Sequence, residues 1–126
     1  MRLNIVRRSA SFVIVIVAAA VIALWTKGTP PPVVSGEVVE TYCWAKLRVG
    51  GPDHAACGIQ CAKRGIPVAV ADAKSREVFI LLPGKDKMAL PSELIAAMGQ
   101  KVNIRGEIVR RDGANFVAVQ SWELAR

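Results

Sequence analysis

Four side chains with the chemistry of metal ligands lie close together near the middle of the chain. They are all three cysteines of the chain and its only histidine: Cys43, His54, Cys57 and Cys61. On a helix, the last three occupy positions i, i+3 and i+7 and project from one face. Three thiolates and one imidazole form a ligand set that suits tetrahedral Zn²⁺ or Cu(I). The sequence therefore predicts a zinc or copper site made by these four residues.

Other interpretations of the same cysteines stay open. The spacing C-x10-H-x2-C-x3-C matches no standard zinc finger. Cysteines outside the cytoplasm tend to be oxidised, and a disulfide from Cys43 to Cys57 or Cys61 would leave one free thiol. Three buried, unreactive thiols are a further alternative. The chain has no C-x-x-C motif, which argues against thioredoxin-type exchange and covalent haem attachment.

The elements that must position these residues follow from the hydrophobic pattern after residue 36. Strands are predicted at 37–44, 67–71, 77–82, 101–110 and 116–122. Short helices are predicted at 53–64, with Asp53 as N-cap and Gly65 as stop, and at 91–98. This order predicts a mainly β fold, a five-stranded OB-fold-like barrel with one or two short helices. Gly106 is expected to mark a bend or bulge. An SH3-like barrel and an open α+β sheet are the alternatives.

The N-terminal region is of a different kind. From Phe12 to Trp25 every residue is apolar, basic residues precede this segment, and no Ala-x-Ala cleavage site follows it. These features predict a single N-terminal transmembrane helix in a signal anchor (1–26), a proline-rich linker (27–35) and a soluble domain (36–126). The charges predict an inner-membrane, single-pass protein with its C-terminal domain in the periplasm. A cleaved signal and an exported soluble domain are the alternative.

The charge balance limits the partners of the domain. The net charge is +7, but four of the 17 Lys and Arg residues precede residue 28. The other 13 stand against 10 Asp and Glu, which gives the domain a charge of only +3. This is too small an excess for a dedicated nucleic-acid binder, and export from the cytoplasm also argues against nucleic acid. The expected partners are the membrane, through the N-terminal helix, and a protein of the cell envelope. No nucleophile, base and oxyanion site occur together, so we expect no enzyme activity.

Three functional hypotheses are consistent with the sequence. The first is a membrane-tethered periplasmic module that binds a zinc or copper ion through the Cys/His cluster. The second is a disulfide-stapled OB-fold interaction module of a cell-envelope complex. The third is an oligonucleotide or oligosaccharide binder that stacks its ligand on Trp44 or Trp122, although such aromatic residues more often belong to a barrel core or rim.

One resemblance concerns the whole region around the cluster. The strand that leads to Cys43-Trp44, the H-x-x-C-x-x-x-C helix and the Gly65-Ile-Pro-Val68 exit together resemble a group of small exported bacterial proteins. The resemblance implies that the domain layout and the Cys/His cluster form one unit. It implies no activity.

Overall fold

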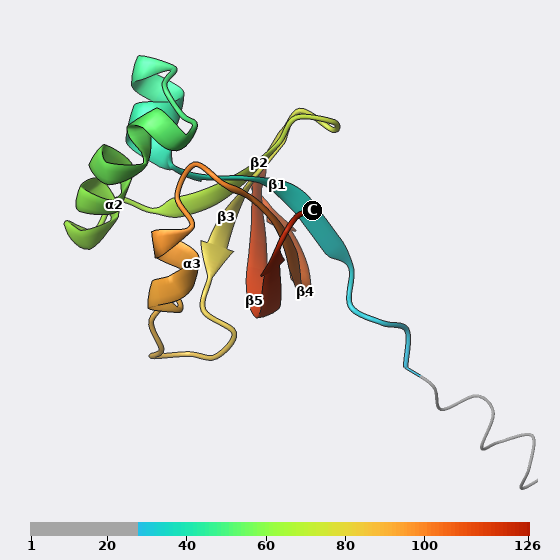
Figure 1. The fold of residues 1–126 in the computed structure, drawn as a ribbon. Coiled ribbons are helices and arrows are strands. Elements are labelled where there is room, and N and C mark those ends of the chain that lie inside the picture. Colours follow the sequence, from blue (N-terminus) through green and yellow to red (C-terminus); the bar gives the residue numbers. More distant parts are fainter. Residues whose placement is uncertain (1–27) are drawn as a thin grey trace, which may run out of the picture. The chain divides into compact units, whose positions relative to one another are not determined.

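The computed structural model describes residues 28–126, and Pro31–Arg126 form one compact unit. The elements of this unit are five strands, two α-helices and two short helical turns. In chain order they are β1 (Val33–Glu40), η1 (Cys43–Leu47), η2 (Pro52–His54), α2 (Ala55–Lys63), β2 (Val68–Asp72), β3 (Glu77–Leu82), α3 (Ser92–Ala96), β4 (Lys101–Arg111) and β5 (Ala114–Leu124). Figure 1 shows η1, η2 and α2 together at one side of the strands.

The five strands close into a barrel in the order β1-β2-β3-β5-β4, with β4 paired to β1. The β3–β5 pair is parallel and every other pair is antiparallel. With α3 between the third and fourth strands, this is the connectivity of an OB-fold-like barrel. The prediction of a mainly β, five-stranded barrel with short helices is thus confirmed.

The β4–β5 hairpin shows how glycine allows the barrel to bend and close. Asp112 and Gly113 both have positive φ angles (+51° and +83°), as a two-residue hairpin turn requires. The register shifts between Arg105 and Gly106, and a Cβ on Gly106 would overlap the backbone carbonyl of Ala118. The bulge predicted at Gly106 is therefore confirmed, and its cause is the close approach of the two strands.

The core of the barrel follows the two-residue period of the strands. Val34 and Val38 of β1 face the same interior as Val102 and Ile104 of β4, and Val38, Val102 and Ile104 are fully buried. Leu94 of α3 is fully buried in the same cluster. One apolar interior therefore joins the strands to α3.

Two boundaries differ from the prediction. β1 begins at Val33, so the last three residues of the predicted linker are part of the barrel. β1 also ends at Glu40, and Cys43-Trp44 lie in the helical turn η1 rather than in the strand. The prediction that the strand reaches residue 44 was wrong, because β-branched and aromatic composition does not report the hydrogen bonds that turn the chain at Glu40.

The predicted anchor over residues 1–26 lies outside the described residues. Within residues 28–126, no helix has the length and apolar character needed to cross a membrane.

Candidate metal site

Cys43 lies at the start of η1, a π-helical turn directly after β1. Glu40, the last residue of β1, creates this turn, because its carboxylate oxygens accept hydrogen bonds from the backbone N–H groups of Tyr42 (2.9 Å) and Cys43 (2.7 Å). The turn ends at Arg48, whose backbone N–H donates to the Cys43 carbonyl. Single π-helical turns are rare and recur at functional sites. Cys43 is only 4% exposed, so its thiol is buried where the chain leaves the barrel.

The loop before His54 is held by two contacts. The Gly51 N–H donates a hydrogen bond to the Glu37 carboxylate. Gly99, which follows α3, has a φ of +77°, and a Cβ there would overlap the Gly51 carbonyl. Only glycine combines this backbone angle with this close approach. The loop is therefore fixed on both sides before it enters η2, which ends at His54.

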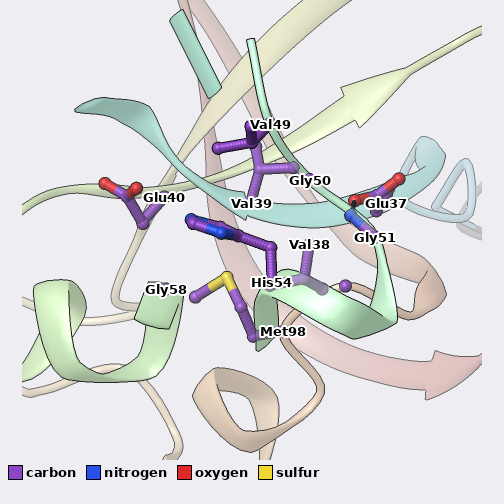
Figure 2. A pocket seen from close by; sticks show the side chains of 11 residues that line it. Glu37, Val38, Val39, Glu40, Val49, Gly50, Gly51, His54, Gly58 and Met98 are labelled. Carbon is purple, nitrogen blue, oxygen red and sulfur yellow. Dashed lines mark hydrogen bonds between the residues drawn. The ribbon is translucent and has the colours of Figure 1, made fainter. Parts of the chain in front are cut away.

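The imidazole of His54 lies in a small pocket at the barrel end, shown in Figure 2. Val39 and Val49 lie on one side of the ring, and Gly58 and Met98 lie on the other. Its Nε2 atom is buried and has no hydrogen-bond partner. The cavity beside it has a volume of about 10 Å³. An unpartnered ring nitrogen of this kind is available as a ligand atom for a metal ion.

α2 carries the two remaining cysteines and packs closely against the barrel end. A Cβ on Gly58, between the two cysteines, would come within 2.8 Å of Met98 Cγ. The absent side chain therefore allows the helix to approach Met98 and Glu40. The helix stops where predicted, at Gly65 (φ +94°), and the Ile66 N–H donates to the Cys61 carbonyl, as in a Schellman motif.

The beginning of α2 differs from the prediction. Asp53 is not the N-cap, because α2 begins at Ala55 and its N-cap is His54, with no side-chain cap hydrogen bond. Pro52 and Asp53 lie in the 3₁₀ turn η2. Proline at the start of this turn presets the backbone and lacks the N–H that a cap would satisfy.

The potential ligand atoms form two groups that share one cysteine. In the first group, the Sγ atoms of Cys43 and Cys57 and a ring nitrogen of His54 lie within 4.8 Å of one another. In the second, Cys43 Sγ, Cys61 Sγ and a carboxylate oxygen of Glu40 lie within the same distance. All three cysteines are free thiols. A tetrahedral zinc ion holds its ligand atoms about 3.5–4 Å apart, so each group is close to the spacing that coordination requires.

The four residues predicted from sequence are therefore distributed over these two groups. Cys43, His54 and Cys57 come together, whereas Cys61 is grouped with Cys43 and Glu40. The helical spacing explains this division, because Cys61 follows His54 by two turns, about 10.5 Å along a helix axis.

Glu40 was not predicted to belong to the site, although the sequence contains a signal for it. It is 2% exposed, and it is the only charged residue of the described chain that is buried. The two-residue period of β1 places it on the same face as Val34 and Val38, which lie in the core. A carboxylate at a core-facing position three residues before a cysteine is a candidate ligand or a partner of the thiol.

The environment of Cys43 favours its protonated form when no metal is bound. Its hydrogen bond to Glu40, then burial, the charge of Glu40 and the neighbouring Cys61 raise the pKa of the Cys43 thiol from 9.0 to about 12. A metal ion must therefore displace a proton from this thiol, so metal affinity should rise with pH.

The raised pKa of Cys43 predicts how the stability of the metal-free protein depends on pH. Between pH 9.0 and about 12 the folded state retains a proton that the unfolded state has lost, so this contribution to stability is complete below pH 9 and declines as pH rises towards 12. We expect the urea midpoint of the full-length chain, measured with chelator, to fall between pH 8 and pH 11. It should fall less for Glu40→Gln, because this variant lacks the hydrogen bond that is the largest cause of the raised Cys43 pKa. Equal falls in both proteins would contradict this prediction.

A second surface feature lies beside the cluster. Apolar side chains are exposed along η1 and the residue that follows Arg48: Tyr42, Trp44, Leu47 and Val49. Trp44 is 39% exposed and lines two hollows, one with Arg48 and one with Arg76 and Lys101. Trp122, in contrast, packs against the core. The surface that the ligand-stacking hypothesis requires is therefore present at Trp44 and not at Trp122.

Comparisons of the chain with protein-family models, with curated proteins and with solved structures give no match. The resemblance to small exported bacterial proteins stays a prediction. The function of the site is therefore inferred from its own geometry and chemistry.

Proposed function

We propose that this chain is a membrane-tethered module that binds a zinc or copper ion through Cys43, His54 and Cys57. The observation that carries the proposal is the convergence of two thiols and an imidazole from two separate segments to within 4.8 Å. The unpartnered Nε2 atom of His54 supports it, because buried polar atoms without partners are rare unless a ligand uses them.

The chemistry of the group favours soft or borderline metal ions. Thiolate and imidazole ligands suit Zn²⁺ and Cu(I), whereas Mg²⁺ and Ca²⁺ require oxygen ligands. Cys57 is exposed, and His54 and Cys61 are half-buried, so an ion can enter from solvent. The buried thiol of Cys43 then becomes its innermost ligand.

The cellular setting is part of the same proposal. The apolar segment from Phe12 to Trp25 would anchor the chain in the inner membrane and place the barrel in the periplasm. There the module would hold or deliver its ion close to the membrane surface, and a protein of the cell envelope is the expected partner. The function proposed is binding of a metal ion and not catalysis.

Metal titration of the full-length chain tests the proposal. We expect the reduced protein in detergent to bind zinc and Cu(I), and cobalt(II) to produce a thiolate charge-transfer band. His54→Ala and Cys57→Ser each remove one ligand of the group, so the affinity should fall at least about tenfold to a hundredfold. The measurement is competition against a chromophoric chelator.

The matched control is Gln60→Ser, which alters an exposed side chain on the same helix. Its affinity should equal that of the wild-type chain. If the reduced wild-type chain binds none of the three ions, or if the two ligand variants bind as tightly as Gln60→Ser, the proposal is wrong.

A further inference from the structure

We propose that the cluster holds two divalent metal ions bridged by the Cys43 thiolate. This inference rests on the proposed function and extends it. The first ion would lie between Cys43, His54 and Cys57, and the second between Cys43, Cys61 and Glu40. The structure divides the potential ligands in this way, with Cys43 the one member common to both groups.

The helical geometry disfavours a single ion that takes all the ligands. Cys61 follows His54 by seven residues, which corresponds to about 10.5 Å along an α-helix and more where the 3₁₀ turn is included. A tetrahedral ion gathers its ligand atoms to within about 4 Å of one another. Cys61 is therefore poorly placed to share an ion with His54, and its thiol is left to a different ion.

Glu40 supplies the second, independent observation. It is 2% exposed, and within residues 28–126 no Lys or Arg forms an ion pair with it. Buried carboxylates without a cationic partner are costly, and they are usually paired or bound to a metal. Its two oxygens each accept one backbone hydrogen bond, from Tyr42 and Cys43. The further hydrogen bond from the Cys43 thiol is lost when that sulfur binds a metal as a thiolate, which leaves a carboxylate lone pair for the second ion.

The charges of the ligands favour two divalent ions. Three thiolates and one carboxylate carry the same amount of charge as two divalent cations, so the complete cluster is neutral. Two Cu(I) ions would leave it negative, and a single divalent ion at the first position would leave the charge of Glu40 without compensation. Neutral clusters are favoured where the ligands are buried, as Cys43 and Glu40 are. Formation of the pair releases the three thiol protons to solvent.

The bridge predicts a particular structure for the loaded site. A shared thiolate would hold the two ions about 3.5–4 Å apart, as in other two-metal sites. Each ion would have three protein ligands, and solvent would complete its coordination on the side where Cys57 is exposed.

Cobalt(II) titration of the reduced full-length chain in detergent tests the inference. We expect two equivalents to bind, with thiolate charge-transfer absorption that grows over both. The electron paramagnetic resonance signal per cobalt should fall during the second equivalent, because bridged ions couple magnetically. Cys61→Ser and Glu40→Gln should each bind one equivalent with an undiminished signal per cobalt. Zinc, followed by elemental analysis, should give the same stoichiometries.

Glu107→Gln is the matched control, because Glu107 is an exposed carboxylate on the neighbouring strand β4 and belongs to neither group. It should bind two equivalents. A wild-type stoichiometry of one would overturn the second ion and leave the proposed function intact, whereas no binding would overturn both. Two equivalents with an unchanged signal per cobalt would overturn the bridge, and so would two equivalents retained in both Cys61→Ser and Glu40→Gln.

Discussion

Replacing Cys43 with serine is expected to weaken metal binding more than replacing either other cysteine. Cys43 is the only residue whose ligand atom belongs to both groups, and it is also the most buried cysteine. A serine hydroxyl does not ionise near neutral pH and is a poor ligand for soft metals. If binding energy is shared among three or four ligands, loss of one costs about 3 kcal/mol, a roughly hundredfold loss of affinity.

The pattern across the three cysteine variants makes this test specific. Cys57→Ser should weaken only the first position and Cys61→Ser only the second, whereas Cys43→Ser should weaken both in the same competition assay. Ala45→Ser, which lies in the same turn and is exposed, should bind as the wild-type chain does. Circular dichroism and urea unfolding check that Cys43→Ser is folded. A folded Cys43→Ser protein with wild-type affinity would exclude Cys43 as a ligand.

The strands of this fold could be predicted because their burial follows a simple period. In β4, Val102, Ile104 and Gly106 are buried between exposed or half-buried residues, which is the alternation that the sequence shows. The hairpin at Asp112-Gly113 and the bulge at Gly106 could be predicted because the backbone there requires particular residue types. These are local rules, and they hold without knowledge of the rest of the fold.

The turn at Cys43 could not be predicted in the same way. It depends on the Glu40 carboxylate, which accepts hydrogen bonds from two backbone N–H groups, while the residue is buried and its Cγ lies near Gly58 of α2. Residue composition alone favours continuation of the strand. Tertiary burial of one charged side chain decides the outcome, and composition does not report it.

The sequence names candidate ligands for the site but does not specify how they are grouped. Residue type alone identified Cys43, His54, Cys57 and Cys61. The division into two groups depends on how α2 crosses the end of β1, which helical periodicity does not specify. Glu40 was missed because carboxylates are common on protein surfaces. Only the two-residue alternation of β1, which puts Glu40 on the same face as the core residues Val34 and Val38, marks it as buried.

Leu94→Ala is expected to cause the largest loss of stability among the substitutions considered. Leu94 is fully buried and joins α3 to the barrel core. Removal of its side chain leaves a cavity and should lower the free energy of unfolding by about 2–5 kcal/mol. For a domain of this size, the melting temperature should fall by about 10–25 °C. Leu94→Met, which conserves volume, should cost less than about 1.5 kcal/mol.

Zinc should partly restore the stability of Leu94→Ala, because Leu94 belongs to neither group of potential ligands and the substitution leaves all of these ligands in place. An ion that binds only the folded state stabilises it by about 2.7 kcal/mol at a free concentration one hundred times its dissociation constant. We expect zinc to raise the urea midpoint of Leu94→Ala, and not that of the doubly substituted Leu94→Ala, Cys43→Ser chain. Leu94 and Met98 belong to the same core cluster, and Met98 lies close to Gly58 of α2. A small loss of zinc affinity should therefore accompany the loss of stability. If zinc leaves the urea midpoint of Leu94→Ala unchanged, the ion does not bind the folded state in preference to the unfolded state. That result would contradict a metal site that forms only when the barrel folds.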